Sequence, residues 1–292
     1  MTFRTRFAPS PTGPLHLGHA YSAMLAYDMA VEQGGEFLLR IEDIDQSRAR
    51  PAWEAQIYDD LAWLGLRWPT PVMRQSERLA VYGATLDSLW KSNHIYPCNC
   101  TRADINAALS APQEGVPTHG PDGLIYPGTC RPDGEQSQSE RPQGDTVLRL
   151  NIAAAIENPD QVFQFTEAGA GPAGETGQIR FTGQDVINQV GDIVIARRDM
   201  GTSYHLAVVL DDAAQGISHV VRGADLFEAT KIHVVLQTLL GLPVPSYHHH
   251  RLIRDDAGKR LAKRDDARAI SAYRNEGLTT QDILSLTDRY GS

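Results

Sequence analysis

The sequence predicts an α/β fold with an inserted segment, and its N-terminal region supplies the first reason. A strand-like stretch at residues 2–8 leads through a loop rich in proline and glycine into a helical pattern that ends near Glu32. Gly34 and Gly35 then break the helix, and residues 37–41 read as a buried strand. A strand, a helix and a second strand in this order predict a βαβ-type unit.

The pattern of the next residues predicts two helices and then the insertion. Residues 53–68 and 78–93 carry apolar side chains at i, i+3 and i+4, which is the pattern of amphipathic helices. Residues 94–185 instead read as short strand-like pieces between proline, glycine and polar segments. Within them, residues 131–145 are poor in apolar side chains and predict a mobile loop.

The α/β pattern resumes after the insertion. Residues 192–199 and 219–226 read as strands, and residues 204–213 form a largely apolar segment that predicts a helix. A basic stretch at residues 248–268 and a short helical tail follow. We therefore expect four parts, namely the first half of the main domain at 1–93, the insertion at 94–185, the second half at 186–250 and a C-terminal segment at 251–292.

Composition narrows the class of protein. With 27 basic and 36 acidic residues the net charge is −9, which argues against non-specific nucleic-acid binding but permits a local basic site. The sequence contains neither an apolar run of membrane-spanning length nor an N-terminal signal region. Three cysteines do not make a disulfide framework. We expect a cytoplasmic monomer with no membrane association.

The loop at residues 6–20, RFAPSPTGPLHLGHA, places two histidines at the mouth of a helix. A helix N-terminus offers free N–H groups and a positive dipole, and imidazoles add hydrogen-bond donors, so the arrangement suits a polyphosphate. An isolated H-x-x-H also recurs by chance, and then His16 and His19 would be ordinary surface residues.

The surroundings of these histidines resemble a known family. PSPTGPLHLGHA is similar to the HIGH signature of the class I aminoacyl-tRNA synthetases, and RFAPSPTG and LLRIEDID resemble its glutamyl/glutaminyl branch. The resemblance implies a Rossmann-like parallel-sheet catalytic domain that activates L-glutamate with ATP and Mg²⁺. It implies that His16, Gly18 and His19 bind ATP, with both histidines catalytic.

A second signature of this family is a lysine-bearing loop, and GKRLAKR at residues 258–264 resembles it. The resemblance implies that Arg260, Leu261 and Lys263 bind ATP and that Lys263 stabilises the leaving pyrophosphate. The chain departs from the family pattern in having Arg260 for lysine and Ala262 for serine. The alternative is a solvated basic run.

A pocket for glutamate needs cations for its two carboxylates and an anion for its amine. The resemblance implies that Arg6, Tyr204 and Arg222 contact the substrate and that Glu42 pairs with the amine. Alternatively, Arg222 bridges surface carboxylates and Glu42 pairs with Arg40 or Arg48. The family's first pocket segment adds Phe7, Ala8, Pro9 and Ser10.

The three cysteines lie in the insertion, in the segments YPCNCT and YPGTC. Thiolates at this spacing can share one Zn²⁺, and His119 is a possible fourth ligand. The pattern C-x-C…Y-x₃-C also resembles a zinc cluster of truncated relatives in this family, which implies a structural Zn²⁺ on Cys98, Cys100, Tyr126 and Cys130. The alternative is three reduced thiols without a metal.

The length of the C-terminal segment suggests the acceptor. Only 28 residues follow Arg264, so we expect no anticodon-binding domain. This anatomy resembles a truncated branch of the family that attaches glutamate to the queuosine base in the anticodon of tRNA-Asp. Two alternatives stay open: an enzyme that charges a tRNA 3′ end, and a non-catalytic paralogue that binds tRNA or nucleotide.

Overall fold

The structure is a computed structural model that describes residues 2–109, 117–134, 140–142, 144, 146–253 and 268–289, with side chains up to residue 287. All statements below concern these residues. The predicted mobile loop at 131–145 falls partly outside them. The lysine-bearing loop, with Arg260, Leu261 and Lys263, falls wholly outside them.

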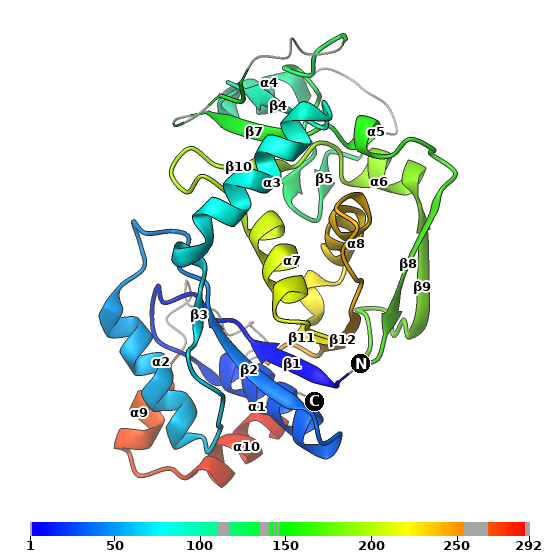
Figure 1. The fold of residues 1–292 in the computed structure, drawn as a ribbon. Coiled ribbons are helices and arrows are strands. Elements are labelled where there is room, and N and C mark those ends of the chain that lie inside the picture. The colour runs from blue at the N-terminus through cyan, green and yellow to red at the C-terminus, as the bar shows by residue number, and fades with distance from the viewer. Residues whose placement is uncertain are drawn as a thin grey trace.

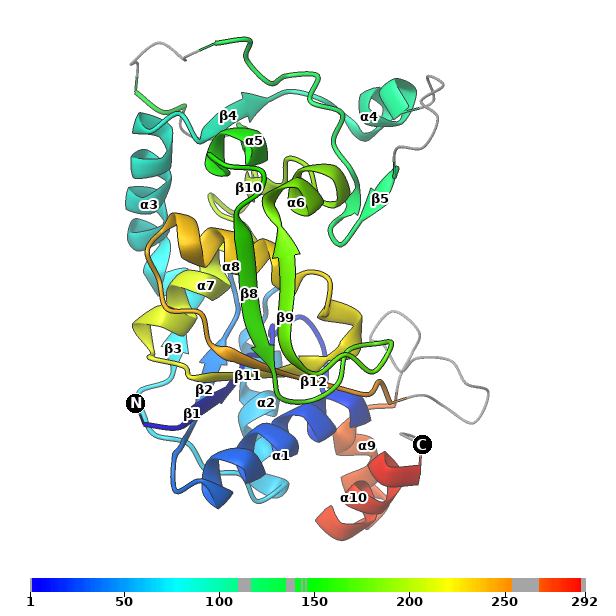
Figure 2. The ribbon, with the colours of Figure 1, turned by 90° about the vertical axis from the view of Figure 1, so that its right-hand side faces the viewer.

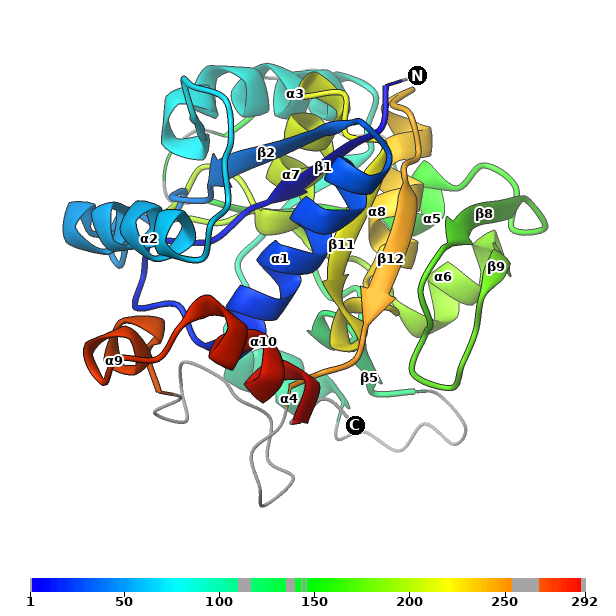
Figure 3. The same ribbon diagram turned by 90° about the horizontal axis from the view of Figure 1, so that it is seen from below.

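A central sheet of parallel pairs occupies the middle of the molecule, as the sequence predicts. Strand β1 pairs with β2 and β2 with β3, while β11 pairs with β12, all in parallel. Strands β1 and β11 lie side by side (Figure 3), and the Ser218 N–H donates to the Arg4 carbonyl at 3.0 Å. The bounds are Arg4–Phe7 for β1, Glu36–Ile41 for β2, Met73–Arg74 for β3, His219–Gly223 for β11 and Ser246–His250 for β12.

Helices cover both faces of this sheet, which is why its strands are mostly buried on both sides. One face carries α1, α9 and α10, and the other carries α7 and α8 (Figure 1). The predicted helices at 53–68 and 78–93 are present as α2 and α3. The bounds are Leu17–Glu32 for α1, Pro51–Trp63 for α2, Leu79–Lys91 for α3, Tyr204–Ala214 for α7, Thr230–Leu239 for α8, Ile270–Asn275 for α9 and Thr280–Arg289 for α10.

The apolar core is divided between the two faces of the sheet. One cluster joins α1 and the C-terminal helices, where Met24 packs with Ile270 and Ile283. The other joins α7 and α8 with the insertion, where Leu206 packs with Leu236. Because the site described below lies between these clusters, its side chains are supported from both sides.

The insertion forms a second body at the end of the molecule opposite α9 and α10 (Figure 1). A small antiparallel sheet in the order β10, β7, β4 lies there, with a short hairpin of β5 and β6. The bounds are Ile95–Cys98 for β4, Arg102–Leu109 for α4, His119–Gly120 for β5, Gly123–Leu124 for β6, Val147–Leu150 for β7, Ile152–Ala155 for α5, Gly183–Gln189 for α6 and Val194–Ala196 for β10.

The strand pairings cross the predicted boundary of the insertion at residue 185. Strands β8 (Val162–Glu167) and β9 (Gly177–Thr182) form a long hairpin along the side of the molecule (Figure 2), and β8 pairs with β12 of the main sheet. Strand β10, beyond the boundary, pairs instead with β7. These pairings join segments far apart in sequence, and such pairs leave no local pattern.

Two short 3₁₀ helices, η1 (Gln75–Arg78) and η2 (Ala224–Leu226), follow β3 and β11. Among the helices of the described ranges, none combines the length and the apolar character that crossing a membrane requires.

Candidate functional site

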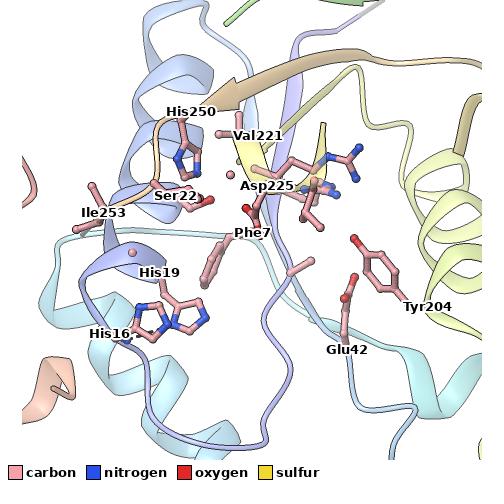
Figure 4. A pocket seen from close by; sticks show the side chains of 17 residues that line it. Phe7, His16, His19, Ser22, Glu42, Tyr204, Val221, Asp225, His250 and Ile253 are labelled. Carbon is pink, nitrogen blue, oxygen red and sulfur yellow. Dashed lines mark hydrogen bonds between the residues drawn. The ribbon is translucent and has the colours of Figure 1, made fainter. Parts of the chain in front are cut away.

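A cavity of about 410 Å³ opens at the carboxyl ends of β1, β2, β11 and β12. Ligands of parallel α/β sheets commonly bind at this edge. His16 and His19 lie at one side of the cavity, and Glu42 and Tyr204 lie at the other (Figure 4). The lining residues are Arg6, Phe7, Ala8, His16, Gly18, His19, Ser22, Glu42, Tyr204, Val221, Arg222, Gly223, Asp225, Leu226, His250, Leu252 and Ile253.

The two histidines begin helix α1. His16 is the N-cap with an extended backbone, and its N–H donates to His19 Nδ1 at 3.2 Å. The two imidazole rings lie 3.7 Å apart between centroids. Gly18 permits this arrangement, because a Cβ there would lie only 3.2 Å from the His16 ring. The loop therefore presents two adjacent imidazoles, tilted by 33° to each other, and a helix N-terminus to the cavity.

The residues that directly precede and follow the segment 254–267 lie beside this cavity or its histidine loop. Leu252 and Ile253 line it on one side. On the other side Ala269 forms a β-bridge with His16, and the Ile270 N–H donates to the Leu15 carbonyl at 2.8 Å. Both ends of the segment that carries Lys263 are thus anchored beside the histidine loop.

A buried network of ions forms the wall of the cavity near Glu42. Arg6 donates to both oxygens of Asp212 at 2.9 and 3.3 Å. Arg40, which is fully buried, donates to Asp212 at 2.6 Å and to Glu42 at 3.0 Å. The predicted alternative that Glu42 pairs with Arg40 is therefore realised, and Glu42 also faces the cavity.

The environment shifts the pKa values of the two carboxyl groups of this network in opposite directions. Burial raises the pKa of Glu42 above 4.5, although Arg40 and Arg6 oppose the shift. Burial acts in the same direction on Asp212, but there Arg6 and Arg40 prevail and lower its pKa below 3.8. Asp212 is thus the fixed counter-ion of the two arginines.

Arg222 reaches the same cavity, and its partners among the described residues are uncharged groups. Its guanidinium donates to His249 Nε2 at 3.1 Å, to His233 Nδ1 at 3.1 Å and to Thr230 Oγ1 at 2.5 Å. Its side chain is 6% exposed, and in the described part of the chain no ion pair joins it to a carboxylate. The alternative that it bridges surface carboxylates is therefore wrong.

The remaining predicted residues of the glutamate pocket are arranged around this cavity. Phe7 and Ala8 line it. Ser10 instead lines a neighbouring cavity of about 210 Å³, which shares Glu42 and Tyr204 with the first. Pro9 contributes its carbonyl, which accepts the Glu42 N–H at 3.0 Å.

The sequence interpretation missed several groups at this site. Asp212 was not singled out, although two carboxylates in the otherwise apolar segment YHLAVVLDDA were a signal for a buried ionic role. Asp225 and His250 also line the cavity, on η2 and at the end of β12. No local pattern marks these two residues, because only the sheet brings them to the cavity.

A second candidate site lies in the insertion, where three thiols gather. Cys98, Cys100 and Cys130 form a group that could hold a metal ion, with their sulfurs within 4.8 Å of one another. The Tyr126 hydroxyl lies 3.4 Å from Cys98 Sγ and 3.3 Å from Cys100 Sγ, and it accepts the Cys130 N–H at 2.8 Å. His119 is exposed and does not join this group.

The surroundings of the thiols suit a cation. Burial opposes ionisation of Cys130, but hydrogen bonds, first from Tyr126, lower its pKa to about 7. Tetrahedral Zn–S bonds of about 2.3 Å place sulfurs roughly 3.8 Å apart, close to the 3.4 Å between Cys100 and Cys130. Arg149 lies over the Tyr126 ring at 3.8 Å and donates to Cys98 Sγ at 3.3 Å. Three thiols and a phenol are a donor set that fits Zn²⁺.

Comparison with known families identifies similar catalytic domains. Residues 2–292 match the model of tRNA synthetases class I (E and Q), catalytic domain. A protein of Rhodobacter capsulatus named Glutamyl-Q tRNA(Asp) synthetase is 59% identical, over 97% of this chain and 98% of its own length. A protein of Geobacter sulfurreducens with the same name is 41% identical, over 92% of this chain and 78% of its own length.

A solved structure is similar in fold. It is a glutamate tRNA ligase from Elizabethkingia meningosepticum in complex with its amino acid, with a TM-score of 0.69 and 28% identity. The match covers 91% of this chain and 53% of that chain, so the present chain spans about half of the solved one.

Proposed function

The chain belongs to the family of class I tRNA synthetases for glutamate and glutamine, and we propose that it activates L-glutamate with ATP and transfers the glutamyl group to the queuosine base in the anticodon of tRNA-Asp. It is thus a ligase. The observation that carries the activation step is one cavity that holds both the paired histidines and the Arg6–Glu42–Arg222 group. The name of the relative at 59% identity supports the acceptor.

In the activation step, an oxygen of the glutamate α-carboxylate attacks the α-phosphorus of ATP. The bond from that phosphorus to the bridging oxygen breaks, and the products are glutamyl-adenylate and pyrophosphate. A carboxylate is already ionised at neutral pH, so this step needs no general base. Catalysis by the protein is then mostly positioning and charge stabilisation.

In the proposed site, His16 and His19 donate hydrogen bonds to the phosphates as negative charge builds, together with N–H groups at the start of α1. Lys263 stabilises the leaving pyrophosphate, and Arg260 and Leu261 hold the nucleotide. The anchoring of Ile253 and Ala269 at the cavity supports this assignment. Mg²⁺ would accompany ATP, held mainly by phosphates and water.

Glutamate occupies the other half of the cavity in this proposal. Glu42 pairs with the ammonium, and Arg222 and Arg6 provide positive charge for the side-chain carboxylate, with Tyr204 beside them. Phe7, Ala8, Pro9 and Ser10 complete the wall as the segment that follows β1.

In the transfer step, a hydroxyl oxygen of the queuosine base attacks the carbonyl carbon of the adenylate. The bond from that carbon to the phosphate oxygen breaks, AMP leaves, and the hydroxyl proton passes to solvent. An anticodon base must be splayed out of its loop to reach the cavity. Six basic residues are proposed to flank the entrance and hold RNA phosphates, namely Arg251, Arg254, Lys259, Arg260, Arg264 and Arg268.

Two of these six residues lie in the described part of the chain. Arg251 lies over the ring of Tyr21 at 5.4 Å, and Arg268 lies over the ring of Tyr273 at 4.3 Å and pairs with Glu276. The tyrosines hold both guanidinium groups near the ends of the segment that carries Lys263.

The acceptor is tested with labelled glutamate and tRNA-Asp that carries or lacks queuosine, each with an intact or enzymatically trimmed 3′ end. We expect label only on queuosine-containing tRNA, unaffected by trimming and released by mild alkali. Periodate is avoided because it also attacks the queuosine diol. Label that disappears on trimming would favour the alternative of 3′-end charging.

Activation is tested separately by ATP–pyrophosphate exchange with glutamate and no tRNA. We expect exchange to proceed, because the proposed ATP and glutamate sites share one cavity. Lys263→Ala should lower kcat on the order of 10²-fold with little change in KM for glutamate. A wild-type chain without any exchange would favour the alternative of a non-catalytic paralogue.

We assign a structural Zn²⁺ to the three cysteines and Tyr126. When bound, the ion would hold together the two cysteine segments, which share only a small apolar cluster, and we propose that it takes no part in the reaction.

A further inference from the structure

The two arginines that reach the cavity are held in different ways. Arg6 is neutralised by Asp212, which also accepts from Arg40. Among the described residues, Arg222 donates to two imidazoles and one hydroxyl, none of which carries a negative charge. Arg222 therefore keeps its positive charge for a ligand, whereas most of the charge of Arg6 is already compensated.

The contacts of Arg222 fix the tautomers of both imidazoles. A guanidinium only donates hydrogen bonds, so His249 Nε2 and His233 Nδ1 must both accept. In the neutral rings the proton then lies on the other nitrogen, which is free to donate further. Burial, above all other causes, lowers the pKa of each histidine, in keeping with neutral rings.

Two series of hydrogen bonds, here called arms, lead away from Arg222. The first arm, Glu167–His249, ends on a buried carboxylate. His249 Nδ1 lies 2.5 Å from Glu167 Oε2, and Glu167 Oε1 accepts the N–H groups of His249 at 2.9 Å and Gly169 at 2.8 Å. Both side chains are almost fully buried. The register of β8 against β12 holds Glu167 there, because Glu167 is the residue that pairs with Tyr247.

The second arm leads from the cavity to the insertion. His233 Nε2, on α8, lies 3.1 Å from His205 Nδ1, on α7. His205 Nε2 lies 3.3 Å from Asp122 Oδ1, in the turn between β5 and β6. With the tautomers set by Arg222, the protonated His233 Nε2 donates to His205 Nδ1, and the protonated His205 Nε2 donates to Asp122 Oδ1. This series of hydrogen bonds ends at the half-exposed Asp122.

We propose that His249 and His233 are positioning residues, and that the arms Glu167–His249 and Asp122–His205–His233 orient the Arg222 guanidinium so that it selects a carboxylate side chain on the substrate. Within the described ranges no carboxylate pairs with this guanidinium. This inference rests on the proposed function, which supplies glutamate as that substrate. An amide has no charge to pair with the buried cation, so glutamine leaves Arg222 uncompensated. Because the second arm ends in the β5–β6 hairpin, the insertion supports the selectivity of the main cavity.

The proposal is tested with His233→Leu, which removes the acceptor, and His233→Asn, whose amide oxygen can replace Nδ1. Exchange kinetics are measured with glutamate and with glutamine, alongside calorimetric binding of L-glutamate. We expect His233→Leu to raise KM for glutamate on the order of tenfold and to reduce the preference for glutamate over glutamine by a similar factor. KM for ATP and kcat with glutamate should stay within about twofold.

The Asn variant and a control separate positioning from general support of the fold. His233→Asn should recover most of the preference. The matched control is His248→Asn, on the same strand as His249 but outside both arms, and it should leave the preference unchanged. Equal losses for glutamate, glutamine and ATP, or no recovery in His233→Asn, would overturn the proposal.

A third variant serves if His233→Leu does not fold. Asp122→Ala, at the exposed end of the second arm, should raise KM for glutamate a few-fold without changing KM for ATP. Wild-type KM in this variant would overturn the role of the β5–β6 hairpin. Failure of the wild-type chain to exchange with glutamate would instead overturn the proposed function.

Discussion

The glutamate side of the main cavity and the cysteine group of the insertion are both polar sites, but they are held in place by different means. Around the cavity, the charged groups are neutralised or oriented by other protein groups, such as Asp212 for Arg6 and Arg40. Beside the thiols, the described residues form a separate small cluster in which Tyr96, Cys98 and Tyr126 are buried and a few neighbours are partly buried. The first site lies between two large apolar clusters, and the second lies in a small cluster of its own.

This difference has a physical reason. Burying a charge is costly unless its partners are fixed, and two large apolar clusters fix them around the cavity. The small cluster around the thiols buries little apolar surface, so a bound metal ion would contribute much of the order of the two cysteine segments. We therefore expect the cavity to survive removal of metal better than the insertion does.

The largest expected effect is that of Cys130→Ser on the insertion. The variant should lose the one Zn²⁺ expected per chain and, with it, on the order of 5 kcal/mol or more of stability in this segment. Metal analysis and limited proteolysis within residues 94–150 would measure both. A metal-free wild-type chain that resists proteolysis there would contradict the assignment.

A matched pair of variants identifies the fourth ligand. Tyr126→Phe should weaken metal retention, because the Tyr126 hydroxyl lies among the sulfurs. His119→Ala should retain the metal, because His119 is exposed and outside the group. The opposite result would identify His119, and not Tyr126, as the fourth metal ligand.

The next largest effect is that of Asp212→Asn on the ionic network of the cavity. Losing this charge leaves Arg40, which is fully buried, and Arg6 with less compensation, and should lower the free energy of unfolding by about 3–5 kcal/mol. Denaturant unfolding measures it. Asp199→Asn, whose pair with Arg197 is exposed, is the control and should change the free energy by less than about 0.5 kcal/mol.

A smaller effect concerns substrate choice by the wild-type cavity. Replacing glutamate by glutamine removes the negative charge that is proposed to pair with Arg222, with a smaller contribution from Arg6, and should cost about 2–3 kcal/mol in kcat/KM of exchange. Aspartate keeps the charge but is one methylene shorter, and should also be a poor substrate. Equal activation of glutamine and glutamate would refute the pocket assignment.

The smallest expected effect is the pH dependence of glutamate binding. Burial raises the pKa of Glu42, so this carboxylate takes up its proton at a higher pH than a free glutamate does. Below that raised pKa, the neutral Glu42 no longer attracts the ammonium, and KM for glutamate should rise a few-fold as the pH falls. In Glu42→Gln, KM should be high at every pH, without this rise. A wild-type KM that is constant down to pH 4.5 would contradict the role of Glu42.

Much of the cavity could be predicted because its parts carry local signals. The histidine loop combines turn residues with a following helical pattern, and α1 begins at Leu17 directly after it. The same holds for Arg6 and Glu42, which lie at the ends of strands with recognisable apolar patterns. The structure brings these residues to one cavity, while their roles in catalysis and binding stay predictions.

The sequence by itself determined the α/β class, the order of the main elements, the histidine loop and the spacing of the cysteines, because each depends on residues close together in the chain. Only the tertiary structure decided that Asp212 neutralises Arg6, that Arg222 is held by His233 and His249, and that β8 joins the main sheet. These contacts join residues from 11 to 206 positions apart. Packing and sheet register choose such partners, and no local periodicity records that choice.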